Sequence, residues 1–400
     1  MINQQTINQK IIHDLIHQGF EAAPLLEHLG IEGGGIHFEG NSSIGKSIIL
    51  IVASSVNGNP KIYVHTWRTT DNALESTCLL RNDSLLVLDE IGEMDPKTLG
   101  ETAYMIANGS GRKRANKAGD GKSIKKWKTL LLSNGEKTLS AHITDGGKAI
   151  KAGQELRIIT IPAEVGCHGA FETIHEFQTG RAFVETLERN AKEYFGTPLR
   201  LFLKTFTSSL TEHKSRAKEH FKHIENLLNK YAINGQIARV AKRFALIAAG
   251  GMLATEFGCT GWQIKDIEEA ILKCFTDWLK DWGEDTAEER AFCEQAQAFF
   301  QRYAGSRFIT KDAKDEEMRT IKDLAGYIYD KPDGSRIYLV NRDVFKREIC
   351  KGIREQKAKE ILFKRKWLIK SSNGWQTSHH IPHLGTTDWF FALLPPVSEK

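Results

Sequence analysis

Cysteine pairs, long apolar runs and internal repeats are all missing from this sequence of 400 residues. Its six cysteines are far apart, with no C-x-x-C pair and no Cys/His spacing typical of a metal site, which argues against a zinc site or a disulfide framework. No apolar run reaches 18 residues and the chain opens with polar residues, so nothing predicts secretion or membrane insertion. We therefore expect a cytoplasmic protein with no membrane partner.

The apolar pattern between residues 31 and 165 alternates strands with helices. Strands are predicted at 36–39, 61–66, 85–89, 129–133 and 156–161. Near-continuous apolar runs of this length suit parallel strands that helices cover on both faces. The sequence thus predicts an α/β core with a parallel sheet over residues 31–170, after an N-terminal helical segment at 1–30.

Two further domains are predicted after this core. Residues 171–305 carry long amphipathic helical runs, which predict a helical lid domain. In residues 306–400, two strand-like runs at 326–329 and 336–340 flank a Pro-Asp-Gly turn and predict a hairpin. Helices near 342–352 and 355–366, followed by a hairpin around Asn373-Gly374, predict a winged helix.

A phosphate-binding motif follows the first predicted strand. Residues 40–47 match the P-loop pattern G-x-x-x-x-G-K-[ST] without a mismatch. The glycines let the backbone N–H groups turn inward at the start of an apolar helix, where a polyphosphate is favoured. The predicted ATP-binding residues are Gly40, Asn41, Ser42, Ser43, Ile44, Gly45, Lys46 and Ser47. We expect Lys46 to neutralise the β- and γ-phosphates and Ser47 to coordinate Mg²⁺.

The strand at 85–89 ends in two acids, Asp89 and Glu90. This pattern fits a Walker B motif, in which Asp89 holds Mg²⁺ and Glu90 is the general base that activates water. The adjacent glutamate favours an ATPase that does mechanical work over a GTPase or a small-molecule kinase. Asn134 ends the strand at 129–133, and we interpret it as a sensor of the γ-phosphate; the other interpretation is an Asn-Gly turn.

Several arginines are candidates for stabilising charge in the transition state. Arg157, at the start of the last predicted strand, is the candidate for a finger that reaches a neighbouring subunit in trans. Arg68, Arg112 and Arg114 compete for this role, and an ordinary surface arginine is an equal alternative for Arg157. Arg243, with Arg239, is a candidate for a second phosphate sensor on the helical lid.

A basic loop lies between the acidic strand and the sensor strand. Residues 112–128 contain eight Lys or Arg and one Asp, a local net charge of +7. Such a loop suits binding of a phosphodiester backbone without reading bases; a solvated surface is the alternative. The predicted nucleic-acid-binding residues are Arg112, Lys113, Arg114, Lys117, Lys122, Lys125 and Lys126. Residues 342–370 form a second basic cluster.

These motifs together resemble a known family. The strings Trp67-Arg68-Thr69, Asp89-Glu90, Asn108-Gly109 and Ser133-Asn134-Gly135-Glu136 are similar to the domain-of-unknown-function 927 family, and the motif order resembles superfamily 3 and D5-like helicases. The resemblance implies a protein encoded by phages, plasmids or integrated mobile elements, often beside or fused to a primase. The resemblance extends over about residues 20–395 and implies an AAA+-type fold. Only a short segment precedes the P-loop, so a primase is expected to be a separate partner.

The function predicted from these features is an ATP-dependent DNA helicase or translocase. We expect a ring, most often a hexamer, that hydrolyses ATP with Mg²⁺ at subunit interfaces and grips single-stranded or forked DNA with basic pore loops. Two alternatives stay open at this point: a nucleotide-dependent switch or defence ATPase that unwinds nothing, and an origin-binding initiator whose winged helix recognises duplex DNA.

Overall fold

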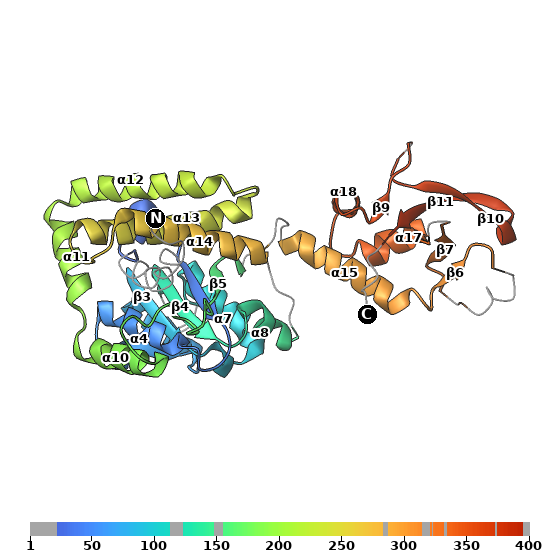
Figure 1. Cartoon of the computed structure of the whole chain (residues 1–400). Helices are drawn as coiled ribbons and strands as arrows, with labels where there is room; N and C mark the ends of the chain where they lie inside the picture. Colours follow the sequence, from blue (N-terminus) through green and yellow to red (C-terminus); the bar gives the residue numbers. More distant parts are fainter. Residues whose placement is uncertain are drawn as a thin grey trace. The chain divides into compact units, whose positions relative to one another are not determined.

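The computed structural model describes residues 22–112, 123–147, 155–282, 287–313, 321, 323–331, 334–372 and 374–394. The chain forms two compact units, residues 1–284 (unit 1) and 285–400 (unit 2), which we describe separately (Figure 1). Most of the predicted N-terminal helical segment lies outside the described residues; within it, helix α3 spans Leu25–Leu29. The finer division of unit 1 at residue 171 stays a prediction.

Unit 1 contains one parallel sheet. Its strands are β1 (Gly34–Glu39), β2 (Val64–Thr66), β3 (Ser84–Asp89), β4 (Thr129–Gly135) and β5 (Ile158–Pro162). Their order is β2-β3-β4-β1-β5, with every pair parallel. The carboxyl ends of β1, β3 and β4 therefore meet at one edge of the sheet, which confirms the predicted α/β fold and places the sensor strand beside the P-loop strand.

Helices cover both faces of this sheet. Between residues 46 and 145 the helical elements are α4 (Lys46–Asn57), α5 (Pro60–Tyr63), α6 (Asp71–Leu80), η1 (Ile91–Glu93), α7 (Pro96–Asn108) and α8 (Leu139–Asp145). Successive side chains of a strand point to opposite faces, so Leu85 and Val87 join one apolar cluster while Leu86 and Leu88 join another. Burial on both faces explains why the strands read as continuous apolar runs.

The predicted strand at 61–66 is wrong in its first half. Residues 60–63 form α5, and the strand β2 begins only at Val64. The Asn59 side chain accepts a hydrogen bond from the Lys61 N–H, and Pro60 occupies the first helical position. An Asn cap followed by proline is a helix-start signal, and here it outweighs the strand preference of Ile62 and Tyr63.

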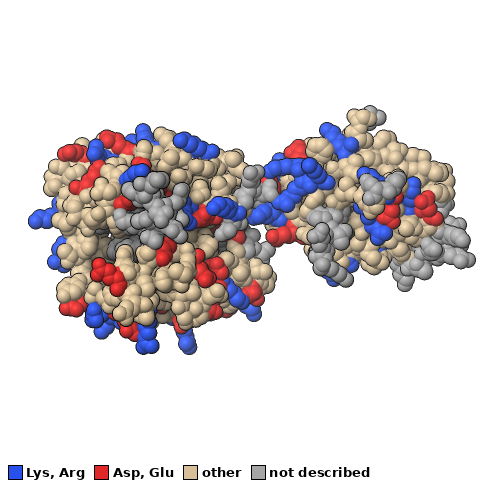
Figure 2. Space-filling model, in the orientation of Figure 1, with Lys and Arg blue, Asp and Glu red and all other residues tan. Residues whose placement is uncertain are grey.

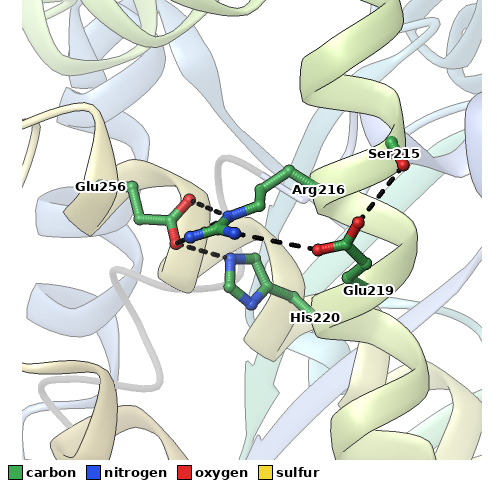
Figure 3. Close-up of polar contacts among 5 residues, drawn as sticks. All are labelled: Ser215, Arg216, Glu219, His220 and Glu256. Atoms are coloured by element: carbon green, nitrogen blue, oxygen red, sulfur yellow. Dashed lines mark hydrogen bonds and ion pairs between the residues drawn. The ribbon is translucent and has the colours of Figure 1, made fainter.

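From Gly180 onward unit 1 consists mainly of helices, in agreement with the predicted helical runs: α10 (Gly180–Glu193), α11 (Thr197–Ser208), α12 (Leu210–Asn229), α13 (Gly235–Glu256) and α14 (Ile264–Trp282). Helices α12, α13 and α14 pack against one another as a layer (Figure 1). Arg216 and His220 of α12 both bond Glu256 at the end of α13 (Figure 3). Each of these contacts has an N–O distance of 3.0 Å. These groups are partly exposed, so the apolar side chains between the helices supply most of the stability.

Unit 2 combines helices with a mixed sheet. Its elements are α15 (Ala287–Tyr303), β6 (Phe308–Thr310), β7 (Gly326–Asp330), β8 (Arg336–Val340), α17 (Arg342–Val344), η2 (Phe345–Ile349), α18 (Glu355–Lys364), β9 (Leu368–Ile369), β10 (Thr377–Ile381), η3 (Pro382–Leu384) and β11 (Thr386–Leu393). The sheet order is β10-β11-β8-β7-β6, and β9 also pairs with β11. The antiparallel pair β7–β8 confirms the two strands predicted at 326–329 and 336–340. Pro332 and Asp333, in the turn between them, lie outside the described residues. The winged helix stays a prediction.

Candidate phosphate and metal site

The P-loop connects the end of β1 to the start of α4. Gly45 has a φ of 102°, in the left-handed region that favours glycine, and a side chain there would place Cβ only 2.8 Å from the Phe171 ring. The Ala170 N–H donates to the Ile44 carbonyl at 2.8 Å, so residues 163–171 support the loop from outside. The loop is thus held against a second segment of the chain, at the positive end of a 12-residue helix.

Lys46 is folded back onto this loop. It is only 6% exposed, and its Nζ donates hydrogen bonds to the carbonyls of Gly40 at 2.7 Å and Asn41 at 2.5 Å. A buried ammonium group requires such partners, because an unpaired charge away from water is costly. The charge of Lys46 therefore lies inside the curve of the loop, where the motif predicts the phosphates.

Three side chains from three elements meet beside Lys46. Ser47 Oγ donates to Asp89 Oδ1 at 3.1 Å, and Asn134 Nδ2 donates to the same oxygen at 2.8 Å. Asn134 Nδ2 also lies 3.4 Å from Ser47 Oγ. The sheet order causes this meeting, since β3, β4 and β1 are consecutive neighbours whose carboxyl ends share an edge. Three of the predicted site residues are thereby brought together.

The oxygen atoms of Ser47 and Asp89 are of the kind that binds Mg²⁺. Mg²⁺ takes oxygen ligands, often one or two from the protein with the rest from phosphates and water. Asp89 and Ser47 supply a carboxylate and a hydroxyl oxygen next to each other. Within the described ranges no group of three or more His, Cys, Asp or Glu is arranged to hold a metal.

Glu90, which directly follows Asp89, has a strained backbone conformation. Its φ of 55° is left-handed, which is uncommon for a residue other than glycine and costs about 1–3 kcal/mol. Two hydrogen bonds hold it: its N–H donates to Asn134 Oδ1 at 2.7 Å, and its Oε1 accepts from the Gly92 N–H at 3.1 Å. Asn134 therefore fixes both acids, Asp89 through its amide nitrogen and Glu90 through its amide oxygen.

A buried polar chain under the site was not found from the sequence. Trp67 Nε1 donates to Ser133 Oγ at 2.8 Å, and Ser133 Oγ lies 3.1 Å from His37 Nδ1. His37 Nε2 lies 3.0 Å from the Lys137 carbonyl, which only accepts, so Nε2 carries the proton and Nδ1 accepts from Ser133. The chain bonds Ser133, which directly precedes Asn134, and the carbonyl of Lys137, three residues after it. A histidine inside an apolar strand was the available signal.

Arg243 lies at the opposite edge of the sheet. Its guanidinium donates to the carbonyls of Leu156 at 2.7 Å and Gly33 at 3.1 Å, which precede β5 and β1. The six residues of β1 separate that edge from the P-loop by about 20 Å at ~3.3 Å per residue. The structure thus does not bring Arg243 to the P-loop of its own chain. Burial, and then the nearby Arg157, lowers the pKa of Arg243 to about 10.

Arg157 is at the same amino-end edge. It lines a cavity of about 410 Å³ together with Arg239, Lys242 and Arg243, opposed by Glu32. Its guanidinium carbon also lies 4.6 Å from the centre of the Tyr104 ring. Arg157 is therefore placed away from its own P-loop, as a residue acting in trans must be, and its role as a finger stays a prediction.

The two ends of the basic loop lie side by side and pair with each other. The Gly111 N–H donates to the Lys125 carbonyl at 2.9 Å, and Ser110 pairs with Lys126 as an isolated antiparallel bridge. Arg112 pairs with Asp71 at 3.0 Å, and Lys125 Nζ donates to Ser76 Oγ at 2.9 Å.

Four of the predicted nucleic-acid contacts, Lys113, Arg114, Lys117 and Lys122, lie outside the described residues. Arg68 is exposed near the end of β2.

The fold and site define a P-loop α/β protein, and comparisons agree with this class. The chain is similar to a solved structure described as Cch of SCCmec type IV, an active helicase, with 20% sequence identity and a TM-score of 0.67. The match covers 97% of this chain and 67% of that chain. At this identity the likeness shows the fold. Among the described residues, no helix is both long and apolar enough to cross a membrane.

A family model described as a domain of unknown function, DUF927, matches residues 4–126. This match confirms the predicted resemblance to that family for the part of the chain that includes the P-loop, the Trp-Arg-Thr string and the two acids. The more specific resemblance to superfamily 3 stays a prediction, as does the extent of the resemblance to residue 395. No curated protein matches the chain.

The buried histidine under the site predicts a specific pH dependence. Burial lowers the pKa of His37 from 6.5 to about 4, so the unfolded chain takes up a proton at a higher pH than the folded chain. Stability is therefore lost as pH falls from about 6.5 to 4, by about 3 kcal/mol from this group. We expect His37→Gln to make the free energy of unfolding depend less on pH between 6.5 and 4. Urea titrations at several pH values measure this dependence.

The control for this experiment is His223→Gln, which replaces an exposed histidine of α12. This variant should keep most of the wild-type dependence on pH. A His37→Gln variant with the same slope as the wild type between pH 6.5 and 4 would contradict the assignment.

Proposed function

We propose that this protein is an ATP-driven translocase or helicase that acts on single-stranded or forked DNA. The observation that carries the proposal is the meeting of Ser47, Asp89 and Asn134 within hydrogen-bond distance beside Lys46. A likeness in fold to a structure described as an active helicase supports it. The match to the DUF927 model over the same motifs is a second support.

In this proposal each residue of the site has a distinct task. Lys46 exchanges its bonds to the loop carbonyls for bonds to the β- and γ-phosphates, and thereby neutralises part of their charge. Ser47 and Asp89 hold Mg²⁺, which when bound offsets charge on the phosphates. Glu90 accepts a proton from the attacking water. Asn134, which bonds both acids, orients the water or the γ-phosphate.

The rest of the proposal concerns neighbouring copies of the chain, nucleic acid and a primase. We propose that Arg157 completes the site of a neighbouring copy in a ring, most often a hexamer, because it lies at the edge of the sheet away from its own P-loop. The loop at 112–128 would grip the nucleic acid backbone, and its nucleotide-dependent movement would pull the strand. A separate primase is the expected partner in replication of a mobile element.

The assignment of Glu90 is tested by Glu90→Gln, which keeps shape and removes the base. We expect ATP binding to persist and turnover to fall by about 10²–10⁴-fold, the usual contribution of a general base. Steady-state hydrolysis and equilibrium binding of ATP measure the two effects separately. The matched control is Glu93→Gln, an exposed acid on the adjacent turn η1, which should hydrolyse ATP at the wild-type rate. Normal turnover in Glu90→Gln would remove this residue as the base.

The role of the basic loop is tested by replacing three of its cations with Gln, at Lys113, Arg114 and Lys126. If the loop grips nucleic acid, hydrolysis stimulated by single-stranded DNA should be lost while basal hydrolysis is kept. The charge-matched control replaces three exposed lysines, Lys218 and Lys222 of α12 and Lys230 directly after it. Equal stimulation in both variants would favour a nucleotide-dependent switch over a translocase.

A further inference from the structure

An exposed aromatic ring near the end of α18, Phe363, contacts the half-buried ring of Trp375 in unit 2. Phe363 is 48% exposed, although the preceding Ile361 and Leu362 are buried in the core of the unit. Its ring centre is 5.7 Å from that of Trp375, with the rings nearly perpendicular at 84°. Lys370 Nζ lies 4.8 Å from the centre of the Trp375 ring and 5.9 Å from that of Phe363. We call Phe363, Lys364, Lys366, Lys370 and Trp375 the aromatic–basic surface.

The backbone holds these rings in place from both sides. The Lys366 N–H donates to the Phe363 carbonyl at 2.9 Å and closes the end of α18. On the other side, the Ser371 N–H donates to the Gly374 carbonyl at 3.0 Å, and the Ser371 hydroxyl donates to the Gln376 carbonyl at 2.8 Å. Trp375 also packs partly against the core of unit 2. The backbone beside both rings is therefore held in place by these contacts, and such preorganisation lowers the entropic cost of binding.

A lysine occupies the position after α18 where glycine is preferred. Lys366 has a φ of 60°, in the left-handed region, where most helices that end this way carry glycine. A side chain in this conformation is strained, because its Cβ lies close to the following carbonyl oxygen. Strain of this kind in a residue with a long charged side chain points to a use for that charge.

The charge around the rings is strongly positive. No acidic residue occurs between Glu360 and Asp388, whereas Lys364, Arg365, Lys366 and Lys370 all fall in this interval. Acids earlier in the basic cluster already have partners: Glu348 bonds Arg307, and Glu355 bonds Lys359. Figure 2 shows Lys and Arg side chains gathered on the part of unit 2 where α18 lies. The potential at this surface favours a polyanion.

We infer that the aromatic–basic surface binds single-stranded nucleic acid, with an unpaired base stacked on the exposed Phe363 ring, which Trp375 supports edge to face, and with neighbouring phosphates held by Lys364, Lys366 and Lys370. The inference rests on the proposed function for its class of ligand. Aromatic rings bind any base through its π-face, and lysines bind the backbone, so this combination serves recognition without sequence preference. Bases of a duplex are already stacked on each other, so the rings select single strands.

The test measures binding of the full chain, without nucleotide, to a fluorescent oligothymidine and to a duplex of equal length. Phe363→Leu keeps an apolar side chain and removes the ring, and we expect it to weaken single-strand binding by about five-fold or more, with duplex binding unchanged. Phe363→Tyr should restore the wild-type affinity. Lys370→Gln should weaken binding of both oligonucleotides and reduce the slope of log affinity against log salt by about 0.7 for the single strand.

Two matched variants serve as controls. Phe195→Leu removes a similarly exposed ring in unit 1, and Lys311→Gln removes a cation that lies 4.5 Å from the Tyr329 ring elsewhere in unit 2. Both should bind single strands as the wild type does, and thermal unfolding should confirm that all variants fold. Unchanged single-strand affinity in Phe363→Leu, or the same loss in Phe195→Leu, would overturn the inference.

This outcome is separate from that of the proposed ATPase. Single-strand affinity is measured without nucleotide, so turnover in Glu90→Gln bears only on the ATPase. If that variant hydrolysed ATP normally while Phe363→Leu lost single-strand binding, the catalytic assignment would fail and the binding surface would stand. Equal losses for single strand and duplex in Phe363→Leu would count against base stacking.

Discussion

The side chain of Asn134 is the point on which the candidate site depends. Its amide nitrogen bonds Asp89 and its amide oxygen bonds the N–H of Glu90, so one residue fixes both acids at the end of β3. This is possible because β4 lies between β3 and β1, which brings the tips of three strands and the P-loop to one edge. Below this edge, the chain from Trp67 through Ser133 to His37 fixes the residue that precedes Asn134. The geometry of the candidate site is thereby tied to the core of the sheet.

The two edges of the sheet in unit 1 have different chemistry. The carboxyl-end edge carries Lys46 with the acids and the amide of the candidate ATP site. The amino-end edge carries the cationic cavity with Arg157 and Arg243, where α13 contacts the starts of β1 and β5. In the proposed ring, the amino-end edge would face the site of a neighbouring copy.

The sequence predicted much of this arrangement for clear physical reasons. Buried parallel strands require continuous apolar runs, so four of the five strands of unit 1 were found within two residues at either end, and the P-loop and the acidic pair identified themselves by residue type and spacing. Local signals failed where two of them competed, as at Asn59-Pro60, where a helix cap displaced a strand. The Trp67–Ser133–His37 chain and the position of Arg243 depend on contacts between distant segments, which periodicity along the chain does not encode.

The central claim is that the edge formed by β1, β3 and β4 binds a nucleoside triphosphate. Titration calorimetry of the folded protein with ATP, in the presence and absence of Mg²⁺, tests it most directly. The account predicts one ATP bound per chain, with tighter binding when Mg²⁺ is present and loss of binding in Lys46→Ala. A folded wild-type protein that binds no ATP, or a Lys46→Ala variant that binds it equally well, would contradict the account.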